Sequence, residues 1–330
     1  MALTNPSSTM GEIVTTTLRN RSGELADNVT KNNGLLKRLR KRGTVKPFSG
    51  GRTIVQEVAY AENGTFKRYS GYETLNIAPS DVISAAEYNI AQAEVAVSIS
   101  GLESLINAGA EQVLDLLEER ISNAVTTLTN NIALDCYSDG TADGGRQIGG
   151  LALLIATNPT TGMVGGFDRS TTAGAFWRNK KFSAATDGGA AASAVNITGY
   201  MNKLWLSLVR GSDRPDLIVA DNNYYNLYWQ SLQAIQRLGP DTSQGEIGFN
   251  SLKYMDADVV YDGGIGGGAP SNQMYFLNTK YLHYRPHSAR NFVPIGDDRM
   301  SVNQDAMVKL IGFAGNMTLS NAALQGVLVA

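Results

Sequence analysis

The chain has 330 residues, of which 43% are hydrophobic and 18% charged, and its formal net charge is −2 at pH 7. This length is sufficient for a large core, in one large or two medium domains. The single cysteine, Cys136, excludes an intramolecular disulfide and any zinc site that needs several cysteines. There is no secretory signal pattern in MALTNPSSTMGEI and no apolar run near the ~18 residues of a membrane span, so we expect a soluble intracellular protein.

Positive charge is concentrated near the N-terminus. The first fifty residues carry nine Lys/Arg and three Asp/Glu, so the remaining residues carry a net charge of −8. The stretch GLLKRLRKRG, residues 34–43, holds five of these bases, namely Lys37, Arg38, Arg40, Lys41 and Arg42. Such a cluster indicates a segment that binds an anionic partner: nucleic acid, a membrane, or the acidic body of another copy. A solvated helix face is the alternative.

In chain order, residues 1–33 are polar and predict an extended arm with one short helix. The leucines of the basic stretch have helical spacing, and Gly43 is placed to end that helix. Two β-prone segments follow, 53–60 and 65–69, joined by Asn63-Gly64, the strongest short signal for a hairpin. Neither segment shows a clean apolar face, so we expect this hairpin to pack on another subunit.

The rest of the chain predicts a long helix and a mixed helix-and-strand region. Alternation predicts strands near 83–99, and an apolar stripe through Leu117, Ile121, Ala124/Val125, Leu128 and Ile132 predicts a helix over 108–137. The further predicted elements are a strand at 151–155, a helix at 197–209, a strand at 216–221, a helix at 222–237 capped by Asp221, strands at 251–262 and 273–284, and a C-terminal strand, Gly-Asn turn and strand.

Candidate catalytic and binding motifs are weak. Gly264, Gly266 and Ala269 match the dinucleotide fingerprint, but a strand pattern follows them where the fingerprint needs a helix N-terminus. Any histidine-based mechanism must use His283 or His287, and no nucleophile elbow or P-loop is present.

Three carboxylates, Asp256, Asp258 and Asp262, alternate along one predicted strand and could face a cation together. A polar strand face is the more economical interpretation, because no loop of the EF-hand type surrounds them. We expect no catalytic residue, no cofactor and no metal.

The order of elements resembles that of the major capsid proteins of tailed bacteriophages, which have the Hong Kong 97-like fold. The stretches that carry the resemblance are GLLKRLRKRGTVKPFSGGRTIVQEV, YSGYETL, FLNTKYL and NQDAMVKLIGFAGNMTLSNAALQGVL. It covers the chain from about residue 30. It implies an α+β fold divided into an N-terminal arm (1–50), an E-loop hairpin (51–80), a peripheral domain with a spine helix (81–145 and 303–330) and an axial domain (146–302).

The resemblance implies a non-enzymatic subunit that self-assembles into pentamers and hexamers, forming an icosahedral or prolate shell around double-stranded DNA. It implies location in the virion after assembly in the bacterial cytoplasm. Candidate partners are other copies of the chain, a separate scaffolding protein, a portal, decoration proteins and DNA bound without sequence specificity; no membrane is implied. The expected inter-subunit contacts are Lys37, Arg38, Arg40, Lys41, Arg42, Asn63, Gly64, Lys67 and Arg68. An encapsulin-type nanocompartment shell and a DNA-binding protein that uses the basic arm are the alternatives.

Overall fold

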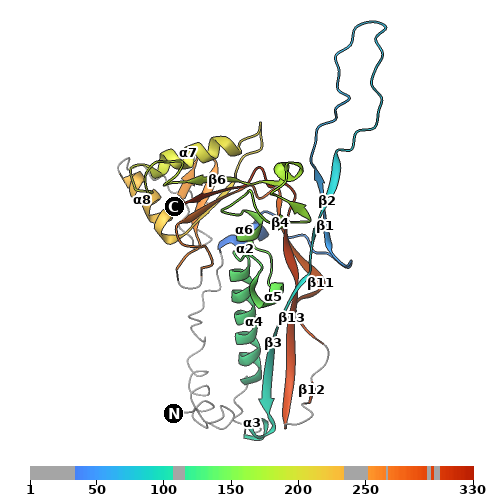
Figure 1. Cartoon of the computed structure of the whole chain (residues 1–330). Helices are drawn as coiled ribbons and strands as arrows, with labels where there is room; N and C mark the ends of the chain where they lie inside the picture. Colours follow the sequence, from blue (N-terminus) through green and yellow to red (C-terminus); the bar gives the residue numbers. More distant parts are fainter. Residues whose placement is uncertain (1–33, 107–115, 234–251, 265–266, 296–298, 301–304) are drawn as a thin grey trace.

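The computed structural model describes residues 34–106, 116–233, 252–264, 267–295, 299–300 and 305–330. It contains two large sheets, one beside a long helix and the other beside two shorter helices, and a loop that projects beyond both (Figure 1). This mixture agrees with the predicted α+β class. Some predictions fall outside these residues: the arm 1–33, the start of the helix 108–137, the end of the helix 222–237, and Gly266.

The longer sheet is built around one strand, β13 (Ala306–Leu319). It pairs antiparallel with β3 (Ala91–Ser100), with β11 (Leu282–Pro294) and with β12 (Arg299–Met300). The pairing with β3 is continuous from Gly315 opposite Ala91 to Ala306 opposite Ser100. This sheet therefore joins a strand from the first third of the chain to its C-terminal part.

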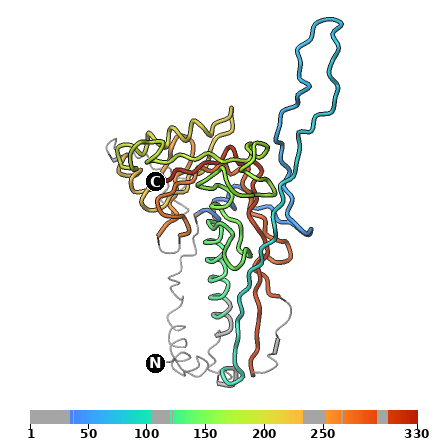
Figure 2. Tube along the Cα trace, in the orientation of Figure 1, coloured from blue at the N-terminus to red at the C-terminus, as the bar shows by residue number. Residues whose placement is uncertain are grey.

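Helix α4 (Leu116–Asp135) runs alongside β3 and β13 and gives this half of the molecule its length (Figures 1 and 2). Ala124, Leu128 and Ile132 of the predicted stripe are buried, as their spacing of four residues requires. The side chains of Leu117 and Ile121 lie outside the described part. Within it, α4 confirms the predicted helix.

The second sheet has six strands and forms the other half of the molecule. From edge to edge the strands are β6 (Lys180–Ser183), β14 (Gly326–Val329), β10 (Gln273–Leu277), β7 (Leu217–Ala220), β9 (Ala257–Tyr261) and β8 (Leu252–Tyr254). Helices α7 (Ile197–Leu208) and α8 (Asn222–Gln233) pack against it, and both confirm predicted helices. Asp221 caps α8 as predicted, since its Oδ1 accepts a hydrogen bond of 2.9 Å from the Tyr224 amide.

The central strands of this sheet are buried on both faces. In β7, Ile218 and Ala220 belong to the core beneath α7 and α8, whereas Leu217 and Val219 belong to the core that contains α4. Successive side chains of a strand point to opposite faces, so an unbroken apolar run is needed where both faces are covered. The sheet thus has one core on each side.

The predicted domain boundaries do not follow these sheets. Strand β14 was assigned with the spine helix but lies in the six-stranded sheet, between β6 and β10. Strand β11 was assigned with the six-stranded part but pairs with β13 in the longer sheet. The chain thus crosses between the two sheets from β10 to β11 and again from β13 to β14.

The predicted hairpin at 53–69 is wrong in its pairing. Strand β1 (Ile54–Ala59) pairs with β2 (Ile83–Tyr88), and residues 65–69 form no strand. Neither Asn63 nor Gly64 has the positive φ that a two-residue hairpin turn of type I′ requires. Strand β1 also has an apolar face, contrary to the expectation from its sequence, because Ile54 and Val58 are buried.

Two further predictions are corrected. The predicted strand at 151–155 is the short helix α6 (Leu151–Leu154), since a short buried apolar run does not distinguish strand from helix. The predicted turn at Gly315-Asn316 lies inside β13. A Cβ at Gly315 would come within 2.7 Å of the Arg285 carbonyl oxygen, so glycine permits close strand approach there.

The remaining elements are short. They are α3 (Gly101–Ile106), α5 (Ala142–Gly145), β4 (Met163–Val164), β5 (Phe167–Asp168) and the 3-10 helix η2 (Ala173–Trp177). A reciprocal capping box starts α3, in which the Ser100 amide donates to Glu103 Oε2 at 3.0 Å and the Glu103 amide donates to Ser100 Oγ at 3.3 Å. Arg120 of α4 pairs with the same Glu103 at 2.8 Å and so holds α3 against α4.

Candidate functional site

The basic stretch forms helix α2 (Gly34–Lys41), which packs on the body of its own chain. Leu35, Leu36 and Leu39 are buried in the core that also contains α4. Gly43 ends the helix as predicted: its φ is +70° and its amide donates to the Arg40 carbonyl at 3.1 Å. The amphipathic pattern therefore identified both the helix and its buried face.

Arg38 forms a buried ion pair with the six-stranded sheet. Its Nη1 lies 3.0 Å from Asp258 Oδ2 on β9, and the two side chains are only 6% and 11% exposed. Taking two charges out of water is costly, and a close pair of opposite sign offsets that cost. Arg38 is thus occupied within the chain.

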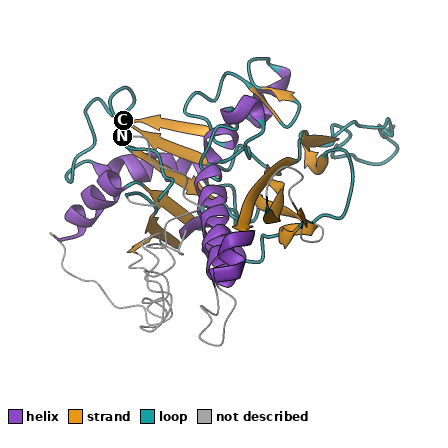
Figure 3. Ribbon diagram, turned by 90° about the horizontal axis from the view of Figure 1, so that it is seen from below, coloured by secondary structure: helices purple, strands orange, loops and turns teal. Residues whose placement is uncertain are grey.

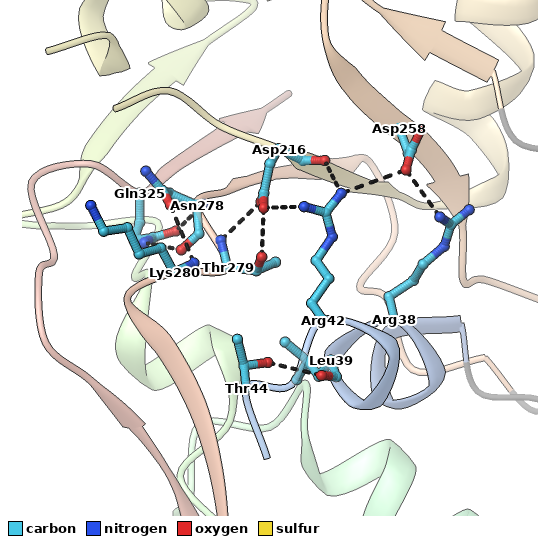
Figure 4. Close-up of polar contacts among 10 residues, drawn as sticks. All are labelled: Arg38, Leu39, Arg42, Thr44, Asp216, Asp258, Asn278, Thr279, Lys280 and Gln325. Carbon is cyan, nitrogen blue, oxygen red and sulfur yellow. Dashed lines mark hydrogen bonds and ion pairs between the residues drawn. The ribbon is translucent and has the colours of Figure 1, made fainter. Parts of the chain in front are cut away.

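Arg42 extends the same contact at a partly exposed position (Figure 4). Its guanidinium bonds the Asp216 carboxylate through Nη1, donates to the Asp216 carbonyl at 3.1 Å through Nη2, and lies 3.6 Å from Asp258. Asp216 is itself held by Thr279, whose amide and hydroxyl donate at 2.9 and 2.6 Å. We call Arg38, Arg42, Asp216 and Asp258 the basic-helix junction.

Asp262 receives the N-terminus of α2. The Leu35 amide lies 3.4 Å from Asp262 Oδ2, where a carboxylate is favoured by the free N–H groups and dipole of a helix start. The Tyr137 hydroxyl donates to the same oxygen. Burial, and then the Asp262 carboxylate, raise the pKa of Tyr137 well above its ordinary value, so this phenol keeps its proton and stays a donor.

The three alternating carboxylates therefore do not form a cation site. Asp258 faces Arg38, Asp262 faces Tyr137 and α2, and Asp256 makes an exposed ion pair of 2.7 Å with Arg214. Within the described ranges, no group of three or more His, Cys, Asp or Glu side chains is arranged to hold a metal ion.

Arg40 and Lys41 differ from their neighbours in α2 because they are exposed. The side chain of Lys37 lies outside the described part of the chain. Behind the helix, residues 44–48 run parallel to β11: the Lys46 amide donates to the Tyr284 carbonyl at 2.9 Å, and the Phe48 amide donates to the Pro286 carbonyl at 3.1 Å. Among the bases of α2 whose side chains the structure describes, Arg40 and Lys41 remain accessible to a partner.

Residues 60–82 form the loop that projects from the molecule, on the side away from the six-stranded sheet (Figures 1 and 3). We call it the long loop. Lys67 pairs with Glu73 across it at 2.9 Å, and the Arg68 guanidinium lies over the Phe66 ring, 5.5 Å from its centre. These two predicted contact residues thus have partners inside the loop, while the loop as a whole remains exposed.

Large apolar side chains on the long loop lie in solvent. Phe66 is 77% exposed and Ile77 is 91% exposed, and Tyr69, Tyr72 and Leu75 are exposed as well. Fully burying a side chain of this size contributes about 1.5–3 kcal/mol. Apolar residues scattered singly are normal on a surface, but a group of this size on one projecting segment indicates a binding surface.

The base of the long loop is fixed by aromatic packing. Tyr60 contacts Phe176 of η2 with ring centres 5.5 Å apart, and Phe176 contacts Phe167 and Trp177 at 5.2 and 6.0 Å. The Glu87 amide of β2 donates to the Gly165 carbonyl at 3.1 Å. The loop therefore projects from an anchored base.

Neither histidine is placed for catalysis. His283 is buried, and burial followed by the charges of Lys46 and Arg285 lowers its pKa to about 4, so the imidazole is neutral at pH 7. His287 packs edge-on against Phe48, with ring centres 5.0 Å apart. Cys136 is fully buried, and burial raises the pKa of its thiol.

The glycine-rich loop after β9 lacks the geometry of a dinucleotide site. The described residues that follow it, 267–277, contain a turn and strand β10 but no helix to receive a pyrophosphate. A Cβ at Gly268 would come within 2.4 Å of the Tyr137 ring, so this glycine serves close packing.

Sequence reasoning missed Asp216 as a functional residue. It was placed only at the start of a buried strand, whereas in the structure it receives Arg42. The carboxylate and the guanidinium are 174 residues apart, and no local pattern in either segment connects them.

No protein-family model matches the chain, and no curated protein matches it. No helix in the described part of the chain combines the length and apolar character needed to cross a bilayer.

Solved structures match over nearly the whole chain. A subunit of the Cyanophage A-1(L) capsid is 17% identical, with a TM-score of 0.69 over 93% of this chain and 94% of that chain. The capsid of Myoviridae phage XM1 matches at 12% identity and TM-score 0.53, over 94% and 97%. The encapsulin complex of Synechococcus elongatus PCC 7942 matches at 8% identity and TM-score 0.53, over 94% of each chain. The chain therefore has the Hong Kong 97-like fold of tailed-phage capsid proteins.

Proposed function

We propose that this chain is the major capsid protein of a tailed bacteriophage. It self-assembles into pentamers and hexamers that form an icosahedral or prolate shell around double-stranded DNA. The observation that carries the proposal is the match to the Cyanophage A-1(L) capsid subunit at TM-score 0.69 over 93% of this chain. In this function the chain is a structural component of the virion, assembled in the bacterial cytoplasm, and it has no catalytic role.

The long loop supplies the main contact to a neighbouring copy in this proposal. Its apolar side chains are exposed in the single subunit, and Phe66, Tyr72 and Ile77 are the most exposed among them. Binding to a second copy removes them from water, which is favourable by roughly 25 cal/mol per Å² of apolar surface. The anchored base holds the loop away from its own subunit, so that it is available to a neighbour.

Arg40 and Lys41 supply a weaker polar contact, to the acidic surface of another copy. The charges of the chain support this assignment, because residues 51–330 carry a net charge of −8. Arg38 and Arg42 are assigned no such role, since both bind aspartates of their own chain. A scaffolding protein, a portal, decoration proteins and packaged DNA are further proposed partners.

Negative-stain electron microscopy of the purified, overexpressed protein tests the proposal. The expected result is closed shells, or rings of five and six subunits. A protein that stays monomeric at high concentration, with its long loop intact by mass spectrometry, contradicts it.

An encapsulin-type compartment is the second candidate, because the Synechococcus elongatus encapsulin complex matches over 94% of each chain. Both candidates predict shells, so the contents and the genetic surroundings separate them. A terminase or portal gene beside this one, or shells filled with DNA, supports the capsid. Co-purification of one enclosed protein without DNA supports the compartment.

A further inference from the structure

The long loop contains an Asn-Gly pair in a defined local geometry. Asn63 Oδ1 accepts hydrogen bonds from the Thr65 amide at 3.0 Å and from the Thr65 hydroxyl at 2.7 Å. The Asn63 carbonyl lies 3.4 Å from the Phe66 amide, which closes a turn of four residues. The pair is exposed, and its contribution to a hairpin was excluded above.

We propose that Asn63 is a site of spontaneous covalent modification, at which the side-chain amide is converted to a carboxylate through a cyclic imide. The backbone nitrogen of Gly64 loses its proton and attacks Cγ of Asn63, forming a new C–N bond. The C–N bond to the side-chain amide nitrogen breaks, and that nitrogen leaves as ammonia. Water then opens the five-membered imide at one of its two carbonyls, giving aspartate or isoaspartate. The reaction consumes one water and needs no oxidant, metal or enzyme.

Two features of the turn favour this reaction. Gly64 has no side chain, and an added Cβ would meet nothing within 4 Å, so its nitrogen can approach Cγ without a steric barrier. The two Thr65 donors are aimed at the oxygen on which negative charge develops as the nitrogen attacks. Donors at 2.7–3.1 Å from such an oxygen lower the barrier, as they do in an oxyanion hole. Thr65 is therefore a positioning residue for the modification.

The same loop provides a matched control. Asn76 also sits in an exposed turn of this kind, in which the Ala78 amide donates to Asn76 Oδ1 at 3.0 Å. Its successor is Ile77, a β-branched residue that crowds the backbone nitrogen. The proposal assigns fast conversion to Asn63 and slow conversion to Asn76.

The modification would change the loop in two ways. Each product adds a negative charge beside Glu62, and isoaspartate also inserts one carbon into the backbone, which displaces the Phe66 amide from the turn. The proposal concerns the unassembled subunit, in which the long loop is exposed, and it is therefore tested on subunits kept from assembling.

Peptide mapping by mass spectrometry tests the proposal on the full-length protein, incubated in mildly alkaline buffer and sampled over days. Trypsin places Asn63 in the peptide 53–67 and Asn76 in a separate peptide. It also separates Asn63 from the second Asn-Gly pair, at 33–34, whose Asn lies outside the described part of the chain. The expected result is loss of ammonia and gain of water at Asn63, with isoaspartate confirmed by enzymatic methylation. Equal conversion of Asn63 and Asn76, or no conversion at Asn63, overturns the proposal.

Two variants separate the steric contribution from that of the donors. Gly64→Ala should slow conversion at Asn63 by about tenfold, which corresponds to about 1.4 kcal/mol of barrier. Thr65→Val keeps the shape and the amide donor but removes the hydroxyl donor, and should slow conversion by a smaller factor. Both lie on the exposed loop, so neither needs the core to repack. An unchanged rate in Gly64→Ala overturns the proposal, and an unchanged rate in Thr65→Val overturns the role assigned to Thr65.

Discussion

Helix α2 and the long loop were both expected to contact a neighbouring subunit. They differ in how many of their side chains are buried or paired within their own chain. In α2 three leucines are buried, and Arg38 of the helix and Arg42 just after it bind aspartates of the same chain. In the long loop the large side chains stand in solvent. Its Lys67–Glu73 ion pair joins one part of the loop to another, and its pair between Glu62 and Arg210 of the body, at 3.7 Å, is exposed. A cluster of charged residues indicates an interaction, but the partner can lie in the same chain or in another molecule. A group of exposed apolar side chains on a projecting loop indicates a partner in another molecule.

The largest expected effect comes from removing the long loop. Ala59 and Ile83 are directly opposite in the β1–β2 pair, so a two-residue Asn-Gly turn can replace residues 60–82. The subunit should stay folded, because the replaced residues carry little of the core. Shell formation should be lost, as measured by electron microscopy and sedimentation. Shells of normal yield from this variant would show that the long loop is not the main contact.

Single truncations should show that α2 contributes mainly to folding of the subunit and the long loop mainly to assembly. Leu39→Ala removes a fully buried side chain and should lower the free energy of unfolding by about 2–5 kcal/mol. Ile77→Ala, at a side chain 91% exposed, should leave subunit stability within about 0.5 kcal/mol but weaken assembly. Urea denaturation and light scattering measure the two quantities. If Ile77→Ala destabilises the subunit as much as Leu39→Ala does, the comparison fails.

Within α2, two arginines only two positions apart should behave differently. Arg38→Ala leaves the Asp258 carboxylate buried without its nearest base and should cost about 3 kcal/mol of unfolding free energy, the lower end of the usual range. The lower end applies because Arg42 lies 3.6 Å from the same carboxylate. Arg40→Ala, at an exposed position, should change unfolding by no more than about 0.5 kcal/mol. Equal urea midpoints for the two variants would contradict the assignment of Arg38 to an internal ion pair.

A pH titration of stability tests the burial of His283 in β11, beside the segment that follows α2. The pKa of His283 is lowered to about 4 by burial and by Lys46 and Arg285, so the folded state binds this proton less readily than the unfolded state, whose pKa is about 6.5. The stability from neutral His283 is present above about pH 6.5 and is lost as pH falls from there toward 4. Replacing His283 by Gln should flatten the decline in melting temperature between pH 6.5 and 5, while His287→Gln should not.

The smallest effect per residue is expected from the exposed bases. Arg40→Glu with Lys41→Glu should slow assembly and leave the fold intact, since exposed ion pairs contribute about 0–1 kcal/mol each. Assembly of the unmodified protein should weaken with salt, because the Debye length falls from about 10 Å at 0.1 M to about 3 Å at 1 M. If these bases contact packaged DNA instead, the double variant forms normal empty shells and fails only in retaining DNA.

Much of the fold could be predicted because its strongest signals are local. The spacing of Leu35, Leu36 and Leu39 identified the buried face of α2, and the apolar run at 217–220 identified a central strand. The errors arose where one local signal had two structural meanings. Asn63-Gly64 and Gly315-Asn316 carry turn chemistry, but the first lies in a local turn without flanking strands and the second inside β13.

The candidate site was harder to predict because its contacts are distant in sequence. The stretch of five bases was found, but its division into internal and exposed residues depends on Asp216 and Asp258, which tertiary structure brings to the same side of α2. Periodicity could place Arg38 on the apolar side of the helix, but it could not identify Asp258 as the carboxylate that Arg38 contacts. For the same reason, local patterns did not show that β11 joins the longer sheet and β14 the six-stranded one.

The place of β14 in the six-stranded sheet has a consequence for synthesis on the ribosome. Strand β6 pairs in parallel with β14, with Lys180 opposite Gly326, so the edge strand finds its neighbour only after roughly 146 more residues have been made. At about 5–20 residues per second, this delay lasts about 7–30 s. Once β10 has been made, the position between β6 and β10 stays unfilled until β14 follows. Until then the nascent chain cannot complete the core on either face of the six-stranded sheet. The geometry thus keeps the subunit incomplete until its last residues are made, and the apolar strands that wait for β14 are prone to aggregate during that interval.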